Sequence, residues 1–162
     1  MKKIVLATTT FSLLLIFILA ACKKDKDQAQ TQDVETLLLN KNWKLTVFTI
    51  DPAIDFGNGP TNDVLSGWDD CEKDDLYIFK TNGVFVSDEG GLDCNGGSGN
   101  QQSTATWSYN KNSKLLTYCI GTTGGCDSYS WTITEISDSQ FKAIASENFN
   151  NTTYNYKVTF SE

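Results

Sequence analysis

The sequence has 162 residues, of which 40% are hydrophobic, 20 are acidic and 13 are basic, so its formal charge is −7. It contains no histidine and no arginine. Histidine-based catalysis and His-ligated metal sites are therefore excluded, and a nucleic-acid partner is disfavoured because phosphate recognition requires a basic surface.

The first 21 residues have the composition of a signal peptide. Met1-Lys2-Lys3 is a short basic start, and residues 4–20 are mostly apolar. Leu19-Ala20-Ala21-Cys22 resembles the lipobox of bacterial lipoproteins, in which the cysteine receives a diacylglyceryl group and becomes the new N-terminus after cleavage. The resemblance implies that Cys22 is lipidated. The alternatives are an ordinary secretory signal or a retained membrane helix, which needs ~20 apolar residues.

Residues 22–33 are expected to form a lipidated cysteine and a flexible tether, because residues 23–33 are charged and Gln-rich. The Lys/Asp-rich start of this tether resembles surface-export signals of some Gram-negative lipoproteins; a solvated spacer is the alternative. Removal of residues 1–21 leaves 11 Lys against 20 acidic residues, a formal charge of −9. The lipid, and not electrostatics, is therefore expected to hold the protein to the membrane. The expected location is the cell envelope, on the outer membrane, at the cell surface or its periplasmic face.

Residues 34–162 are predicted to form an all-β domain that begins with a short helix at residues 34–40. Apolar residues alternate with polar ones through most of the domain, which is typical of half-buried strands. The predicted strands are 43–47, 75–80, 84–88, 104–109, 114–120, 129–133, 141–145 and 154–160. Eight strands joined mostly by short turns favour an antiparallel up-and-down barrel; a β-sandwich is the alternative. Two long connectors remain, residues 51–74 and 89–103, and the first holds both prolines outside any predicted strand.

Four cysteines remain once Cys22 is assigned to the lipid: Cys71, Cys94, Cys119 and Cys126. An even number in an exported chain predicts disulfides, with three possible pairings. A Gly-rich turn separates Cys119 from Cys126, so a hairpin would bring these two together. The favoured pairs are therefore Cys119 with Cys126 and Cys71 with Cys94. Zinc binding is the alternative, but the Cys-x₂₋₄-Cys spacing of zinc sites is missing.

An acidic segment in the first long connector is a weak candidate for a Ca²⁺ site. Its carboxylates belong to Asp69, Asp70, Glu72, Asp74 and Asp75. A solvated acidic loop beside a disulfide is the favoured interpretation. The Gly-rich segment 89–99 lacks the Lys and the following helix of a phosphate loop, and no cofactor is expected. Because the acids fall in loops or in the tether and not on facing strands, we do not expect an enzyme.

Several short motifs occur in an order that is typical of one family. They are residues 37–45 (LLLNKNWKL), 71–75 (CEKDD), the Phe79-x-x-Asn82-Gly83 turn, Cys94, Thr106-Trp107-Ser108 and residues 133–141 (ITEISDSQF). Together they resemble the lipocalin-like domain of bacterial lipoproteins, over residues 35–161. The resemblance implies a closed barrel around a pocket for small, often apolar molecules, with Trp43 at the closed end. Lys41 stands where animal lipocalins have Gly, and Lys157 is the cation expected over the Trp43 ring.

Aromatic side chains are expected on one face of the strands, either as barrel core or as pocket lining. The candidate pocket residues are Trp43, Phe79, Phe85, Trp107, Tyr118, Tyr129 and Trp131. The predicted function is a lipid-anchored envelope protein that binds a small hydrophobic or amphipathic ligand. The alternative is a non-enzymatic structural or interaction protein with a filled barrel, whose loops meet another envelope protein or a glycan. The volume of the interior distinguishes the two.

Overall fold

The computed structural model describes residues 33–94, 102–120 and 125–162. The predictions for the signal peptide, for Cys22 and for the tether up to residue 32 lie outside these residues. Within the described ranges, no helix is both long and apolar enough to cross a membrane.

The described chain is an antiparallel β-structure with a few short helical turns. Helix α1 (Val34–Leu38) comes first, as predicted. The strands are β1 (Trp43–Asp55), β2 (Pro60–Asp63), β3 (Leu76–Lys80), β4 (Val84–Asp88), β5 (Gln102–Asn110), β6 (Leu115–Ile120), β7 (Asp127–Ile136), β8 (Gln140–Phe149) and β9 (Thr152–Ser161). The remaining helical turns are η1 (Leu65–Gly67), α2 (Asp70–Lys73) and η2 (Thr81–Gly83).

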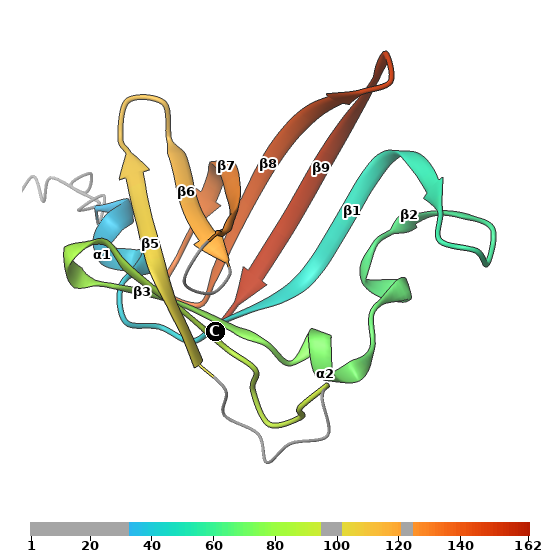
Figure 1. The fold of residues 1–162 in the computed structure, drawn as a ribbon. Helices are drawn as coiled ribbons and strands as arrows, with labels where there is room; N and C mark the ends of the chain where they lie inside the picture. Colours follow the sequence, from blue (N-terminus) through green and yellow to red (C-terminus); the bar gives the residue numbers. More distant parts are fainter. Residues whose placement is uncertain (1–32, 95–101, 121–124) are drawn as a thin grey trace, which may run out of the picture. The chain divides into compact units, whose positions relative to one another are not determined.

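The sheet closes into a barrel. Its order is β2-β1-β3-β4-β5-β6-β7-β8-β9, and β1 also pairs with β9 from Lys44↔Ser161 to Asp51↔Asn155. The closed ring therefore has eight antiparallel strands, β1 and β3 to β9, and the predicted barrel is confirmed. Helix α1 lies at one end of the barrel, and the tips of the β1–β2 and β8–β9 hairpins lie at the other (Figure 1).

The first long connector contains structure that the sequence analysis did not predict. Strand β1 continues through Pro52 and then pairs with β2, which begins at Pro60. The expectation that both prolines lie outside strands is therefore wrong. Both positions tolerate a missing N–H, because the pairing of β1 with β9 ends at Asp51 and Pro60 is the first residue of its strand.

A β-bulge in β1 changes which side chains face the interior. The register against β9 shifts between Leu45 and Val47. Trp43 and Leu45 are buried, as predicted, but Val47 is 42% exposed and Phe48 turns inward to pack against the core. The bulge inserts one extra residue and so moves every later side chain to the opposite face.

The half of the barrel next to α1 is filled by side chains. Its largest fully buried residues are Trp43, Phe79, Phe85, Phe141, Phe160, Leu38 and Leu116. The rings pack edge to face or stacked, as between Phe79 and Phe85 (centroids 5.4 Å apart) and between Phe141 and Phe160 (4.5 Å). This half of the barrel is core and not cavity.

Trp43 closes this end of the barrel. Its indole Nε1 donates a hydrogen bond of 3.0 Å to the carbonyl of Leu38 in α1, and its ring lies 5.0 Å from that of Phe141. The cation over the ring is Lys41, whose Nζ lies 5.4 Å from the ring centroid. The expectation that Lys157 covers this ring is wrong, because Lys157 lies at an exposed, outward-facing position farther along β9.

Candidate ligand-binding site

Strands β7 and β8 separate toward the end of the barrel opposite α1. Their ladder runs from Ile136↔Phe141 to Thr132↔Ile144 and ends there. Strand β7 nevertheless stays paired with β6 as far as Asp127, and β8 with β9 as far as Phe149. Residues 127–131 of β7 therefore pair only with β6, and residues 145–149 of β8 pair only with β9. This leaves an opening between the two segments.

A pocket of about 210 Å³ occupies this opening. Its lining comes from four strands: β1, β7, β8 and β9. The lining residues are Phe48, Tyr129, Ser130, Trp131, Ala145, Glu147 and Tyr156. Most of them occupy inward-facing positions of their strands. Closer to α1, the inward-facing residues of the same strands fill the core.

Aromatic rings form the walls of the pocket. The rings of Phe48, Trp131 and Tyr156 contact one another, with centroid separations of 6.0 Å (Phe48–Trp131), 6.1 Å (Phe48–Tyr156) and 6.5 Å (Trp131–Tyr156). Tyr129 stacks on Tyr118 of the core at 5.7 Å. Ala145 lies directly across from Tyr156 in the β8–β9 ladder. Its small side chain leaves the space that a larger residue would fill.

A single acidic side chain, Glu147, stands among the described lining residues. It is exposed at the mouth of the pocket. Burial raises the pKa of the Tyr156 hydroxyl, and the nearby Glu147 charge raises it further. The pKa of Tyr129 is raised by burial first and then by Asp127 and Glu147. Both phenols therefore stay neutral at pH 7, and Glu147 is the charged group of the site.

Trp131 brings a buried polar atom to the site. The residue is 7% exposed, and its indole N–H has no hydrogen-bond acceptor among the described residues. Burial raises the pKa of the neighbouring Tyr118 hydroxyl well above its usual value, and the Trp131 side chain opposes this rise. The two groups are therefore close, but they do not meet the geometry of a hydrogen bond.

The structure brings together only part of the predicted aromatic pocket. Tyr129 and Trp131 line the pocket between β7 and β8, whereas Trp43, Phe79, Phe85 and Tyr118 belong to the packed core. For these four the structure supports the core alternative, since neighbouring rings occupy the space around them. Five lining residues were not singled out from the sequence: Phe48, Ser130, Ala145, Glu147 and Tyr156.

Trp107 lies in a different place. It helps to line a second, more open pocket of about 360 Å³ beside α1 and the β3–β4 turn. The other lining residues are Glu35, Leu39, Thr81, Asn82, Gly83, Ser108 and Tyr109. The Trp107 Nε1 donates a hydrogen bond of 2.8 Å to the carbonyl of Lys80, which fixes the ring against the turn.

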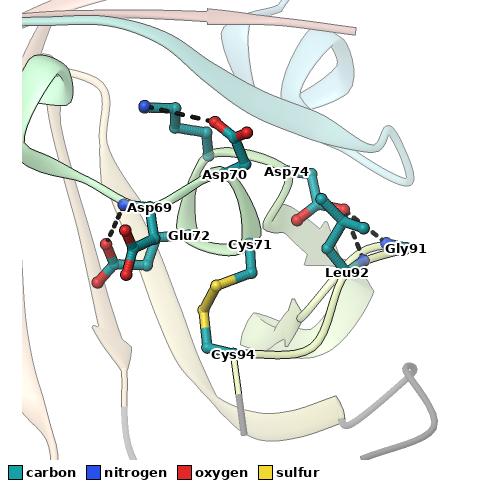
Figure 2. The surroundings of a disulfide bond; sticks show 9 residues. Asp69, Asp70, Cys71, Glu72, Asp74, Gly91, Leu92 and Cys94 are labelled. Carbon is teal, nitrogen blue, oxygen red and sulfur yellow. Dashed lines mark hydrogen bonds and ion pairs between the residues drawn. A yellow bond between two sulfur atoms is a disulfide. The ribbon is translucent and has the colours of Figure 1, made fainter. Parts of the chain in front are cut away.

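Two disulfides brace the loops, with the pairing expected from the sequence. Cys71 in α2 is joined to Cys94, and Cys119 at the end of β6 to Cys126; their Cα atoms lie 5.3 and 5.6 Å apart. Figure 2 shows that the first bond ties α2 to the chain that follows β4. All four thiols are therefore used in disulfides and not in a zinc site.

The acidic residues around this disulfide hold the backbone (Figure 2). Asp69 and Glu72 form a capping box at the start of α2, where Glu72 accepts a hydrogen bond of 2.8 Å from the Asp69 N–H. Asp74 Oδ2 accepts hydrogen bonds from the N–H groups of Gly91 (2.7 Å) and Leu92 (2.9 Å). These carboxylates thus serve as hydrogen-bond acceptors for backbone N–H groups at the start of α2 and in the loop after β4.

The weak Ca²⁺ candidate of Asp70, Glu72, Asp74 and Asp75 is not supported. In the described part of the chain, no three side chains of the metal-ligating types gather around one point. Asp70 pairs with Lys73 at 3.6 Å. Burial, together with repulsion from Glu89 and other nearby acids, raises the pKa of Asp75 to about 6. The segment is an acidic loop beside a disulfide, as favoured, but Asp74 and Asp75 are partly buried and not fully solvated.

Comparison with protein families agrees with this geometry. A family model described as a lipocalin-like domain matches residues 39–143, about two thirds of the chain. A search of curated proteins finds no match. The matched segment includes Phe48, Tyr129 and Trp131 of the pocket, while Ala145, Glu147 and Tyr156 lie beyond it.

Proposed function

Because this chain belongs to the lipocalin-like domain family, we propose that it binds a small amphipathic molecule in the pocket between β7 and β8. One observation carries the proposal: the barrel is filled by side chains next to α1 but opens into an aromatic pocket where the β7–β8 ladder stops. Ligand pockets usually measure ~300–1,000 Å³. A pocket of about 210 Å³ therefore suits one ring or a short chain, with the rest of the ligand outside.

Binding, and not catalysis, is the proposed activity. Glycoside hydrolysis typically uses two carboxylic acid side chains at a defined separation. Among the lining residues described, only Glu147 has a carboxylate. The lining otherwise consists of aromatic rings, Ala145 and Ser130, which suit retention of a ligand.

A substitution within the pocket tests the binding proposal. Ala145→Phe fills the space opposite Tyr156, whereas Ile144→Phe places the same ring on the exposed outer face of the same strand. Titration of tryptophan fluorescence with a neutral aromatic probe should show binding by the parent and by Ile144→Phe, and loss of binding by Ala145→Phe. Circular dichroism of both variants verifies that they fold. Equal binding by the two variants would contradict the proposal.

We also propose that the protein is a lipoprotein of the cell envelope, on the outer membrane. In this proposal residues 1–21 are the signal peptide, Cys22 is lipidated, residues 22–33 are the tether and residues 34–162 are the barrel. The lipobox-like Leu19-Ala20-Ala21-Cys22 supports it, and two disulfides in the domain are typical of exported proteins.

Replacement of the lipidated residue tests the anchor. Cys22→Ser should accumulate as a full-length precursor that palmitate analogues do not label, because the serine has no thiol to acylate. Fractionation of membranes and blotting of the processed form measure this. A Cys22→Ser protein that is still lipidated and cleaved would disprove the lipoprotein assignment, whatever the result of the ligand titrations.

Exposed aromatic residues at the open end favour a second candidate function, in which the loops bind another envelope protein or a glycan. Phe149 at the β8–β9 turn is 66% exposed, and Phe56 at the β1–β2 turn is 49% exposed. Exposed rings of this kind are enriched in interfaces. This function predicts that the parent protein fails to bind any small probe and that Phe149→Ser impairs association with the partner.

A further inference from the structure

We propose that the pocket between β7 and β8 selects organic cations, namely molecules that carry an ammonium group on a small apolar body. This inference rests on the proposed ligand-binding function of the same pocket. It specifies the charge of the ligand and the part of the pocket that recognises this charge. Three observations support it: the position of Glu147, the rings beside it, and the absence of a basic side chain among the described lining residues.

Glu147 belongs to the inward-facing row of β8. Phe141 and Ala143 of this row are buried in the core, and Ala145 and Glu147 follow at intervals of two toward the open end. In the β8–β9 ladder Glu147 lies across from Tyr154, two residues beyond the pair Ala145↔Tyr156. A carboxylate at such a position faces the ligand space and not the outer surface of the barrel.

No protein cation neutralises this carboxylate in the described chain. Lys41, Lys73, Lys111 and Lys142 form the ion pairs that the structure shows, and none of these pairs includes Glu147. The lining residues that the structure describes include no Lys, and the sequence contains no Arg. Glu147 can therefore pair with a cation that the ligand supplies.

The aromatic walls add to the attraction. The faces of Phe, Tyr and Trp rings are negative, so they attract ammonium groups within about 6 Å of the ring centroid. Phe48, Trp131 and Tyr156 form a cluster in which every pair of rings is in contact, and Tyr129 lies beside them in the lining. Rings and carboxylate together make a site that favours positive charge and holds an apolar body.

The arrangement also fixes the orientation of the ligand. Trp131 is almost completely buried, whereas Glu147 is exposed at the mouth. The apolar body therefore lies inside, against Phe48, Trp131 and Ala145, and the ammonium group lies at the mouth beside Glu147. An anionic amphiphile in the same orientation would place its charge next to this carboxylate, and no basic side chain among the lining residues at 33–94, 102–120 and 125–162 would offset the repulsion.

Three probes of nearly equal shape test this selectivity on the full chain. They are benzyltrimethylammonium (positive), its carbon isostere neopentylbenzene (neutral) and phenylmethanesulfonate (negative). Tryptophan fluorescence titrations should give an affinity for the cation that is at least about tenfold higher than for the other two. Added NaCl should weaken binding of the cation and leave binding of the neutral probe unchanged.

Two matched variants identify the residue responsible. Glu147→Gln should lower the affinity for the cation severalfold, leaving only the preference that the rings supply, without changing the affinity for the neutral probe. Glu135→Gln is the control, because Glu135 is exposed at the other end of β7 and pairs with Lys142. It should bind all three probes as the parent does.

The outcomes separate this inference from the proposed function. If the parent binds the neutral or the negative probe as tightly as the cation, cation selection is wrong and ligand binding stands. Binding of none of the three overturns both. If Glu147→Gln loses the neutral probe as well, Glu147 shapes the pocket instead of recognising charge, and the inference fails.

Discussion

Replacement of Trp43 by alanine removes the side chain that closes the barrel beside α1. The ring is fully buried, so the variant loses its packing and creates a cavity among Phe141 and its neighbours. It also loses the hydrogen bond from Nε1 to the Leu38 carbonyl, which leaves that carbonyl without its side-chain donor. The ammonium of Lys41 loses the ring beneath it.

The expected loss of stability is large. Replacement of a buried Trp by Ala typically costs about 3–5 kcal/mol, including the cavity. The lost hydrogen bond adds about 1 kcal/mol. A total of about 4–6 kcal/mol approaches the whole stability of a small domain, which is about 5–15 kcal/mol. We therefore expect Trp43→Ala to be partly unfolded at 37 °C.

Urea denaturation followed by circular dichroism measures this effect. Trp43→Phe is the matched control, since it keeps an aromatic ring against Phe141 but lacks the donor to Leu38; we expect it to lose about 1–2 kcal/mol. A Trp43→Ala protein within about 1 kcal/mol of the parent would refute the assignment of Trp43 as the residue that closes the barrel.

Three further predictions concern the acidic loop. Burial and nearby acids raise the native pKa of Asp75 from 3.8 to about 6. The unfolded chain therefore loses this proton at a lower pH than the folded one, and stability falls as the pH rises from about 4 to about 6 and then stays constant. After allowance for solvent screening, Asp75→Asn should stabilise the protein by about 1–2 kcal/mol at pH 7.5 and very little below pH 4, and a gain independent of pH in denaturation curves would contradict this. Gly90→Ala should lower the thermal midpoint, because Gly90 has φ +68° and a Cβ there would lie 2.5 Å from the carbonyl oxygen of Asp74; an unchanged midpoint would disprove this close approach. Removal of the Cys71–Cys94 bond by double alanine substitution should lower the free energy of unfolding by about 3.5 kcal/mol. Removal of the Cys119–Cys126 bond should lower it by about 2.5 kcal/mol, because that bond closes a shorter loop. The reverse order in urea denaturation would refute this chain-entropy argument.

The barrel follows from the sequence because alternation is a local signal. Most strands of the ring show apolar residues at every second position over much of their length, and most sequential strands are joined by short turns. The helix α2 also had a local signal, Asp69-x-x-Glu72, which is the capping-box pattern. The same residues also fit a solvated acidic loop, because a capping box is only two polar residues at a spacing of three.

The pocket could not be derived in the same way. Its location depends on where the β7–β8 ladder stops, after Thr132↔Ile144, and this is a property of two paired strands and not of either one. Phe48 enters the lining because a bulge reverses the alternation in β1. Glu147 follows the alternation of β8, but on a sequence alone an acidic residue near a hairpin turn is most simply interpreted as solvated.

The β1–β9 pairing constrains how the protein can fold during synthesis. Thr46 donates a hydrogen bond to the carbonyl of Thr159, 113 positions farther along the chain. A ribosome therefore releases the first strand of the ring long before its partner exists, and until β9 emerges the nascent sheet has free edges on β1 and β8. Contacts between such distant positions form slowly. The barrel can therefore close only after β9 has emerged, and a factor that shields the β1 edge in the meantime would raise the yield of folded protein.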